Sequence, residues 1–228
     1  MIRFVLMDLD DTILDFHRAE AAAVSRTFER MGIEPSTELV QRYSEINAAH
    51  WRMLERGEIT RPQVLIGRFR QLFSEIGADC DPEKTQQIYE AHLSRGHYFI
   101  PGAEQLLRDL HGEYLLYLVS NGNAVVQEGR LKSAGIAPFF EDIFISEEVG
   151  ADKPSREYFD RCFAKIPEFQ PEQAILIGDS PTSDILGGIH AGVKTCWFNP
   201  DHRPPHPDIQ ADFEIDRLSA LPALLKSI

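Results

Sequence analysis

Two acidic residues follow the first apolar run of the chain, two positions apart. Residues 4–7 are typical of a buried strand, and Asp8 and Asp10 come directly after them. Near the end of a strand, residues two apart project to the same side. One carboxylate can attack phosphorus while the other exchanges protons with the leaving alkoxide and with water. The spacing therefore indicates covalent catalysis through an aspartyl-phosphate on Asp8, with Asp10 as acid and base.

More polar residues follow later apolar segments. Ser120 and Asn121 come after residues 114–119, and Lys153 lies in the loop beyond residues 142–146. Asp179 and Asp184 follow residues 174–178. Because ligands bind beyond the carboxyl ends of strands in an open parallel sheet, we expect these side chains to meet Asp8 and Asp10 at one edge.

So many carboxylates would repel a phosphate dianion unless a cation were present. Mg²⁺ prefers oxygen ligands, and the expected ligands are Asp8, the backbone carbonyl of Asp10 and Asp179. Asp184 would either bind the ion directly or support one of these ligands. Lys153 would bring a positive charge to the nucleophile and the phosphoryl oxygens.

The phosphoryl group also needs hydrogen-bond donors as its charge redistributes. The hydroxyl of Ser120 and the backbone N–H groups of Thr12 and Asn121 are the predicted donors, together with Lys153.

These residues require a parallel sheet to position them. Five segments are continuously apolar and do not alternate with polar residues, which is typical of strands covered on both faces. They are residues 2–7, 114–119, 142–146, 174–178 and 194–198. Helical patterns at 125–136, 155–166 and 183–192 separate the later segments, which predicts a doubly wound α/β fold. Residues 211–228 offer a further short strand and a terminal helix.

The interval between the first two strands is helical throughout. Apolar residues recur every three or four positions in residues 17–33, 37–57, 60–77 and 82–96. Four helices exceed one crossover connection. We therefore expect an α/β core domain of residues 1–15 and 99–228, with an inserted helical cap of residues 16–98.

Four motifs carry a family resemblance. "DLDDTIL" from Asp8, "VSNG" from Val119, "GADKP" from Gly150 and "GDSPTSD" from Gly178 resemble, in order, the motifs of the haloacid dehalogenase (HAD) superfamily of hydrolases. The resemblance implies a Rossmann-like core with a helical cap that excludes water and shapes specificity. It also implies that the nucleophile, acid/base, hydroxyl, lysine and metal acid are Asp8, Asp10, Ser120, Lys153 and Asp179.

A finer resemblance concerns the substrate. "VSNGNAVVQEGRLKSAGI", "RGEITRPQVLIGRF" and "GDSPTSDILGGIHAG" are similar to the pyrimidine 5'-nucleotidase branch. This implies a phosphatase acting on nucleoside 5'-monophosphates or similar small phosphorylated metabolites. A sugar-phosphate or phosphoglycolate phosphatase is the alternative, and a phosphomutase a weaker one.

Two other classes of protein use similar residues. A 2-haloacid dehalogenase would use the same aspartate on a C–halogen bond, but halide leaves without a proton and needs neither Asp10 nor Asp179. A receiver-like phosphoacceptor module also combines aspartates, a hydroxyl and a lysine, but it lacks a large insertion after the first strand. A binding descendant would be expected to have lost at least one catalytic residue.

Several polar residues have more ordinary interpretations. In the cap, Phe16, His17, His50 and Trp51 are the candidates for substrate specificity, although each could be an ordinary core or surface residue. Asp11 is expected to be a solvated loop acid and Asp15 a cap or hinge residue. The prolines between His202 and His206 exclude a helical metal site.

Composition limits the partners. The formal net charge of −13 disfavours nucleic acid, and no apolar run reaches the length of a membrane span. Three separated cysteines suggest neither disulfides nor structural zinc, which fits a cytoplasmic protein. We expect a monomer or homodimer that binds a small phosphorylated metabolite.

Overall fold

One parallel sheet forms the centre of the larger half of the molecule. The structure is a computed structural model that describes residues 1–228. The strand order is β3-β2-β1-β4-β5-β6, and every neighbouring pair is parallel. The strands are β1 (Phe4–Met7), β2 (Leu115–Ser120), β3 (Asp142–Ile145), β4 (Ala174–Gly178), β5 (Lys194–Phe198) and β6 (Phe213–Ile215). This is the predicted doubly wound α/β fold, whose strand order reverses at β1 and β4.

Helices cover both faces of the sheet, which explains the continuous apolar strands. Phe4 and Leu6 of β1 pack on one face, and Val5 and Met7 pack on the other. The first face is covered by α8 (Arg156–Phe163) and α9 (Leu186–Ala191). The second is covered by α5 (Ala103–Leu110), α6 (Ala124–Ala134) and α10 (Leu221–Ser227).

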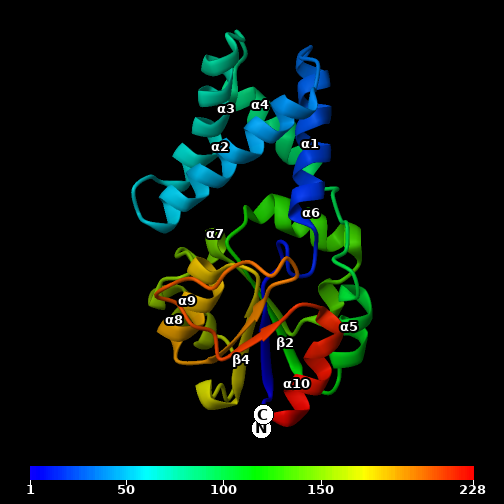
Figure 1. Cartoon of the computed structure of the whole chain (residues 1–228), viewed down its shortest axis with the longest axis vertical. Coiled ribbons are helices and arrows are strands. Elements are labelled where there is room, and N and C mark those ends of the chain that lie inside the picture. Colours follow the sequence, from blue (N-terminus) through cyan, green and yellow to red (C-terminus); the bar gives the residue numbers. More distant parts are fainter.

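Four helices are inserted between β1 and α5. They are α1 (Phe16–Met31), α2 (Thr37–Glu55), α3 (Arg61–Ile76) and α4 (Pro82–Leu93). Their inner faces share an apolar cluster that includes Phe28, Tyr43, Phe69 and Tyr89. Figure 1 shows this bundle beyond one end of the sheet, with both chain ends at the opposite end of the molecule. The packing supports the proposed division into core and cap domains.

Local sequence signals set the limits of the cap helices. Ser36 and Asp81 accept hydrogen bonds from backbone N–H groups in the first turns of α2 and α4. Gly32 and Gly77 adopt positive φ at the ends of α1 and α3, a conformation that costs glycine little.

The helix α5 lies outside the helical patterns of the sequence. Its buried residues nevertheless have helical spacing: Ala103, Leu106, Leu107 and Leu110. With only eight residues, its pattern is too short to stand out. Short helical turns also occur at α7 (Ser146–Val149) and η3 (Pro181–Ile185). None of the helices is long and apolar enough to cross a membrane.

Candidate active site

The polar residues meet where the strand order reverses. The backbone N–H of Asp8 donates to the carbonyl of Ile177 at 2.9 Å, which extends the pairing of β1 and β4 by one residue. Asp8 therefore lies beside the end of β4, where Asp179 begins the next loop. This is the position at which doubly wound sheets bind ligands.

Lys153 lies at the centre of the site and is 1% exposed. Its Nζ donates to Asp8 Oδ1 at 2.6 Å, to Asp184 Oδ1 at 2.7 Å and to the carbonyl of Val119 at 2.9 Å. The side chain of Asn121 accepts from the Lys153 N–H and donates to the Lys153 carbonyl, both at 2.8 Å. The loop after β2 thus fixes the lysine that the loop after β3 supplies.

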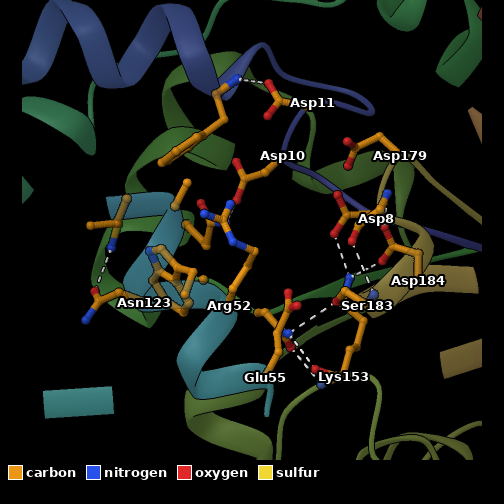
Figure 2. A pocket seen from close by; sticks show the side chains of 18 of the residues that line it. Asp8, Asp10, Asp11, Arg52, Glu55, Asn123, Lys153, Asp179, Ser183 and Asp184 are labelled. Carbon is orange, nitrogen blue, oxygen red and sulfur yellow. Dashed lines mark hydrogen bonds and ion pairs between the residues drawn. The ribbon is translucent and has the colours of Figure 1, made fainter. Parts of the chain in front are cut away.

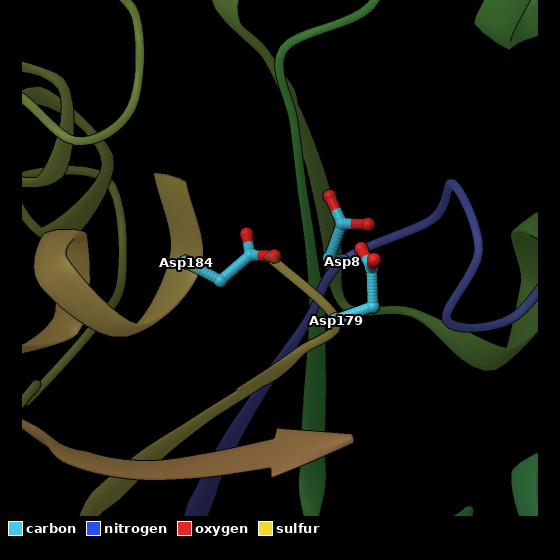
Figure 3. Close-up of side chains that lie close together, drawn as sticks. All are labelled: Asp8, Asp179 and Asp184. Atoms are coloured by element: carbon cyan, nitrogen blue, oxygen red, sulfur yellow. The ribbon is translucent and has the colours of Figure 1, made fainter. Parts of the chain in front are cut away.

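Three carboxylates form a compact cluster around this lysine. Asp8, Asp179 and Asp184 each offer one oxygen within 4.8 Å of the others, and Figure 3 shows them facing a common point. The Ser180 N–H donates to Asp184 Oδ2 at 3.1 Å. Gly178 makes room for this arrangement, because a Cβ there would overlap the Asp184 carboxyl. Clustered carboxylate oxygens are the ligands that Mg²⁺ prefers, so the donor set fits that ion.

The cluster perturbs its own protonation. Burial raises the pKa of Asp8 well above its usual range, against the opposing effect of Lys153. Burial also raises the pKa of Asp179 to about 8, and the neighbouring charges of Asp184 and Asp11 add to the effect. Burial alone would lower the pKa of Lys153, but Asp184 and Asp8 outweigh it and raise that pKa. A bound divalent cation would favour the ionised acids.

Asp10 is held by two residues that the sequence analysis did not identify. Gln127 Nε2 donates to Asp10 Oδ2 at 2.7 Å, and Arg130 forms an ion pair with Asp10 Oδ1. Both residues belong to α6, three positions apart on one face. Only the packing of α6 buries these two side chains, so no sequence signal marked them.

Ser120 and Thr12 are both buried near the strand ends. The Ser120 Oγ accepts from the N–H of Gly122 at 3.1 Å and from Gln127 Nε2 at 2.9 Å. The hydroxyl of Thr12 has no hydrogen-bond partner. Their phosphate-binding roles remain predictions.

The turn after Asp10 corrects one expectation. Asp11 is not a solvated loop acid: its Oδ1 accepts from the N–H groups of Phe16 at 2.8 Å and His17 at 3.3 Å. Burial raises the pKa of Asp11 to about 6, despite the nearby His17. Asp15 is the N-cap of α1 and accepts from the Arg18 N–H at 2.8 Å, which confirms a capping role.

A cavity of about 440 Å³ connects the acid cluster to the cap. Figure 2 shows Arg52 and Glu55 of α2 reaching toward Lys153 and the acids from the cap side. Of the four predicted specificity residues, Phe16 and Trp51 line the cavity, whereas His17 and His50 do not. The cap side of the cavity is lined by Phe16, Ala48, Trp51, Arg52, Glu55, Leu65, Arg68, Gln86, Tyr89, Glu90 and Leu93.

Three further polar residues line the cavity without a local sequence signal for that position. Arg203, in the proline-rich loop, donates to the Asp179 carboxylate at 3.3 Å. Glu55 accepts from the Thr182 hydroxyl at 3.1 Å, and burial raises its pKa. Arg68 is buried in the cap, where it binds Asn47 and Gln86. Glu55 and Arg203 lie outside every motif, and Arg68 lies within the stretch of residues 56–69, whose pattern does not show which of its side chains face the cavity.

Known proteins are similar to this chain in sequence and in fold. The model of the family described as haloacid dehalogenase-like hydrolase matches residues 5–198. The chain is 43% identical to the HAD-hydrolase YfnB of Bacillus subtilis over 219 residues, 96% of this chain and 93% of that protein. It is 35% identical to the pyrimidine 5'-nucleotidase PynA of Streptococcus pneumoniae over 214 residues, 93% of this chain and 90% of PynA.

Solved structures extend the comparison. A crystal structure of YfnB bound to magnesium, reported to reveal interdomain movement, has a TM-score of 0.94 and covers 98% of both chains. The L-2-haloacid dehalogenase from Xanthobacter autotrophicus has a TM-score of 0.80 over 100% of both chains. Its sequence identity of 15% means that the likeness concerns the fold alone.

Proposed function

The chain belongs to the haloacid dehalogenase-like hydrolases, and we propose that within this family it is a Mg²⁺-dependent phosphomonoester hydrolase acting through Asp8. The observation that carries the proposal is the pairing of a buried Asp8–Lys153–Asp184 arrangement with a second carboxylate, Asp10, on the same cavity.

In the first step, Asp8 attacks phosphorus and the ester P–O bond breaks. Asp10 gives its proton to the leaving alkoxide, and Lys153 stabilises charge on the transferring group. In the second step, water attacks the aspartyl-phosphate, Asp10 takes the proton, and the bond between phosphorus and Asp8 breaks. Free phosphate leaves and both aspartates are restored.

Mg²⁺ would be held by Asp8, Asp179 and Asp184, where it would neutralise phosphoryl charge. The backbone carbonyl of Asp10 is a further predicted ligand. Support comes from the clustered oxygens and from the magnesium in the related YfnB structure.

We infer that the substrate is a nucleoside 5'-monophosphate or a similar small phosphometabolite. A cavity of about 440 Å³ is within the range that small-molecule sites occupy. Its cap side combines the aromatic rings of Trp51 and Tyr89 with the polar groups of Arg68, Gln86 and Glu90, which suits a planar, hydrogen-bonding base. The related pyrimidine 5'-nucleotidase PynA supports the same class.

The dehalogenase alternative has less support. Halide departs without a proton and does not require the acids Asp10, Asp179 and Asp184 on the cavity. The L-2-haloacid dehalogenase from Xanthobacter autotrophicus shares the fold only.

The test is phosphate release from nucleoside monophosphates, sugar phosphates and phosphoglycolate, each with Mg²⁺ and with EDTA. We expect release that requires Mg²⁺ and falls by about 10⁴-fold or more in Asp8→Asn. Asp201→Asn, which neutralises an exposed aspartate, is the matched control. Full activity in Asp8→Asn would refute the mechanism, and equal activity on every substrate would refute the nucleotide assignment alone.

A further inference from the structure

Two residues of α6 hold the Asp10 carboxylate from both sides. Gln127 Nε2 binds one oxygen, Arg130 Nη1 binds the other, and Arg130 Nη1 also donates to Gln127 Oε1 at 3.0 Å. The Gln127 amide nitrogen bridges Asp10 and Ser120, at 2.7 and 2.9 Å. Gly122 leaves space for it, since a Cβ there would overlap the Gln127 side chain.

Arg130 also contacts both connections between core and cap. Its side chain is fully buried, and its Nε donates to the carbonyl of Gly96 at 3.0 Å, just after α4. On the other connection, its guanidinium lies 5.7 Å from the ring centre of Phe16, the first residue of α1. One guanidinium therefore contacts Asp10 and both segments that connect the core to the cap, at Phe16 and at Gly96.

A purely structural explanation accounts for only part of this. A buried arginine needs a carboxylate partner, and Asp10 would serve that need. Gln127 carries no charge, so it is not needed to balance the buried arginine. Its amide nitrogen donates to Asp10, which is predicted to move protons, and to Ser120, which is predicted to bind phosphate. Gln127 therefore contacts the groups that would react with or bind the substrate.

We propose that Arg130 and Gln127 are positioning residues that orient the Asp10 carboxylate and tie that orientation to the two cap connections. This inference rests on the phosphohydrolase function proposed above. Neither residue exchanges a proton with the substrate. Both act by keeping one oxygen of Asp10 in line with the leaving group and then with the attacking water.

The two half-reactions depend on Asp10 differently, which provides a readout. p-Nitrophenolate leaves from p-nitrophenyl phosphate without needing a proton, whereas the ribose alkoxide of uridine 5'-monophosphate needs one. Hydrolysis of the aspartyl-phosphate needs Asp10 as base with either substrate. A misplaced Asp10 should therefore slow both steps for the nucleotide but only the second step for the nitrophenyl ester.

The experiment measures rapid-mixing and steady-state kinetics of Arg130→Met, Arg130→Lys and Gln127→Leu with these two substrates. We expect the nucleotide kcat to fall about 10- to 100-fold with KM changed less than about threefold. With p-nitrophenyl phosphate we expect a burst of about one product per enzyme, followed by slow turnover. Lys132→Met removes a positive charge from the exposed side of α6 and should match the parent.

Arg130→Lys separates charge from geometry. A lysine keeps the charge but replaces the planar guanidinium, whose Nε and Nη1 bind the Gly96 carbonyl and Asp10 separately, by one ammonium group, so we expect a loss close to that of Arg130→Met. If Arg130→Met does not fold by circular dichroism, Gln127→Leu and Arg130→Lys carry the test.

Two results would overturn the inference. One is parent-like nucleotide kcat in folded Arg130→Lys and Gln127→Leu. The other concerns the same substitutions made in Asp10→Ala. If they lower kcat there by the same factor as in the parent, the inference fails, because residues that act through Asp10 should cause no further loss once Asp10 is removed. A parent enzyme that releases no phosphate from either substrate would instead refute the proposed function.

Discussion

The raised pKa of Asp179 predicts how stability depends on pH when Mg²⁺ is removed. The Asp179 side chain is 22% exposed, and its pKa is raised from 3.8 to about 8, mainly by burial. Between these values the folded protein keeps a proton that the unfolded chain releases. The associated stability is fully present below pH 3.8, falls as pH rises from there, and is lost once pH has passed about 8.

The size of the effect follows from linkage. One proton bound only by the folded state lowers the free energy of unfolding by about 1.4 kcal/mol per pH unit as pH rises. From pH 5.5 to 7.5, Asp179 should therefore cost roughly 2 to 3 kcal/mol. Asp179→Asn cannot ionise, so its stability should fall by about that much less over the same interval.

Urea denaturation in EDTA at the two pH values measures this difference. Asp201→Asn, which neutralises an exposed aspartate, should follow the parent curve. Adding Mg²⁺ at pH 7.5 should stabilise the parent, since an ion that binds only the folded state shifts the equilibrium toward it. Asp179→Asn should gain less. Equal pH dependence in Asp179→Asn and the parent would show that this carboxyl is not held protonated.

Three further perturbations test the surroundings of the site. Arg61 of the cap donates to the carbonyls of Asn121 and Gly122 at 3.0 and 3.1 Å, so Arg61→Ala should lower kcat/KM about tenfold by loosening the cap. Arg70 is exposed, so Arg70→Ala should leave kcat/KM unchanged. Equal kcat/KM values in the two variants would contradict a catalytic effect of the contact between Arg61 and the loop after β2. Gly178→Ala should cost about 1–3 kcal/mol in urea denaturation because its Cβ would overlap a buried carboxyl, and a neutral result would contradict that crowding. Arg203 lowers the pKa of Asp179, so Arg203→Gln should extend the metal-free loss of stability to higher pH, whereas an unchanged pH profile would refute this coupling.

Much of the core could be predicted from local patterns. Residues 174–178 and 194–198 are strands with the predicted bounds. Short continuous apolar runs of this kind are typical of parallel strands that are covered on both faces. Asp8, Lys153 and Asp184 meet as expected because parallel strands deliver their following residues to one edge. The eight-residue α5 could not be predicted, since so short a segment shows little helical periodicity.

The cap side of the site could not be predicted in the same way. His17 and His50 have suitable residue types and positions along the chain for substrate contacts, yet neither lines the cavity. Which side of a helix faces the cavity depends on how the four cap helices pack and how the bundle sits over the sheet. Arg68 and Gln86 come from different helices, α3 and α4, and meet only in that packing.

The sequence by itself determined the succession of β1 to β5 along the chain, the acids at the ends of β1 and β4, and the helical insertion that follows β1. Those features are local, because each depends on residues a few positions apart. The tertiary structure alone decided that α6 holds Asp10 through Gln127 and Arg130, and that a proline-rich loop brings Arg203 to Asp179. These contacts join residues 24 to 120 positions apart, so only the packing of α6 and of that loop against the strand ends could create them.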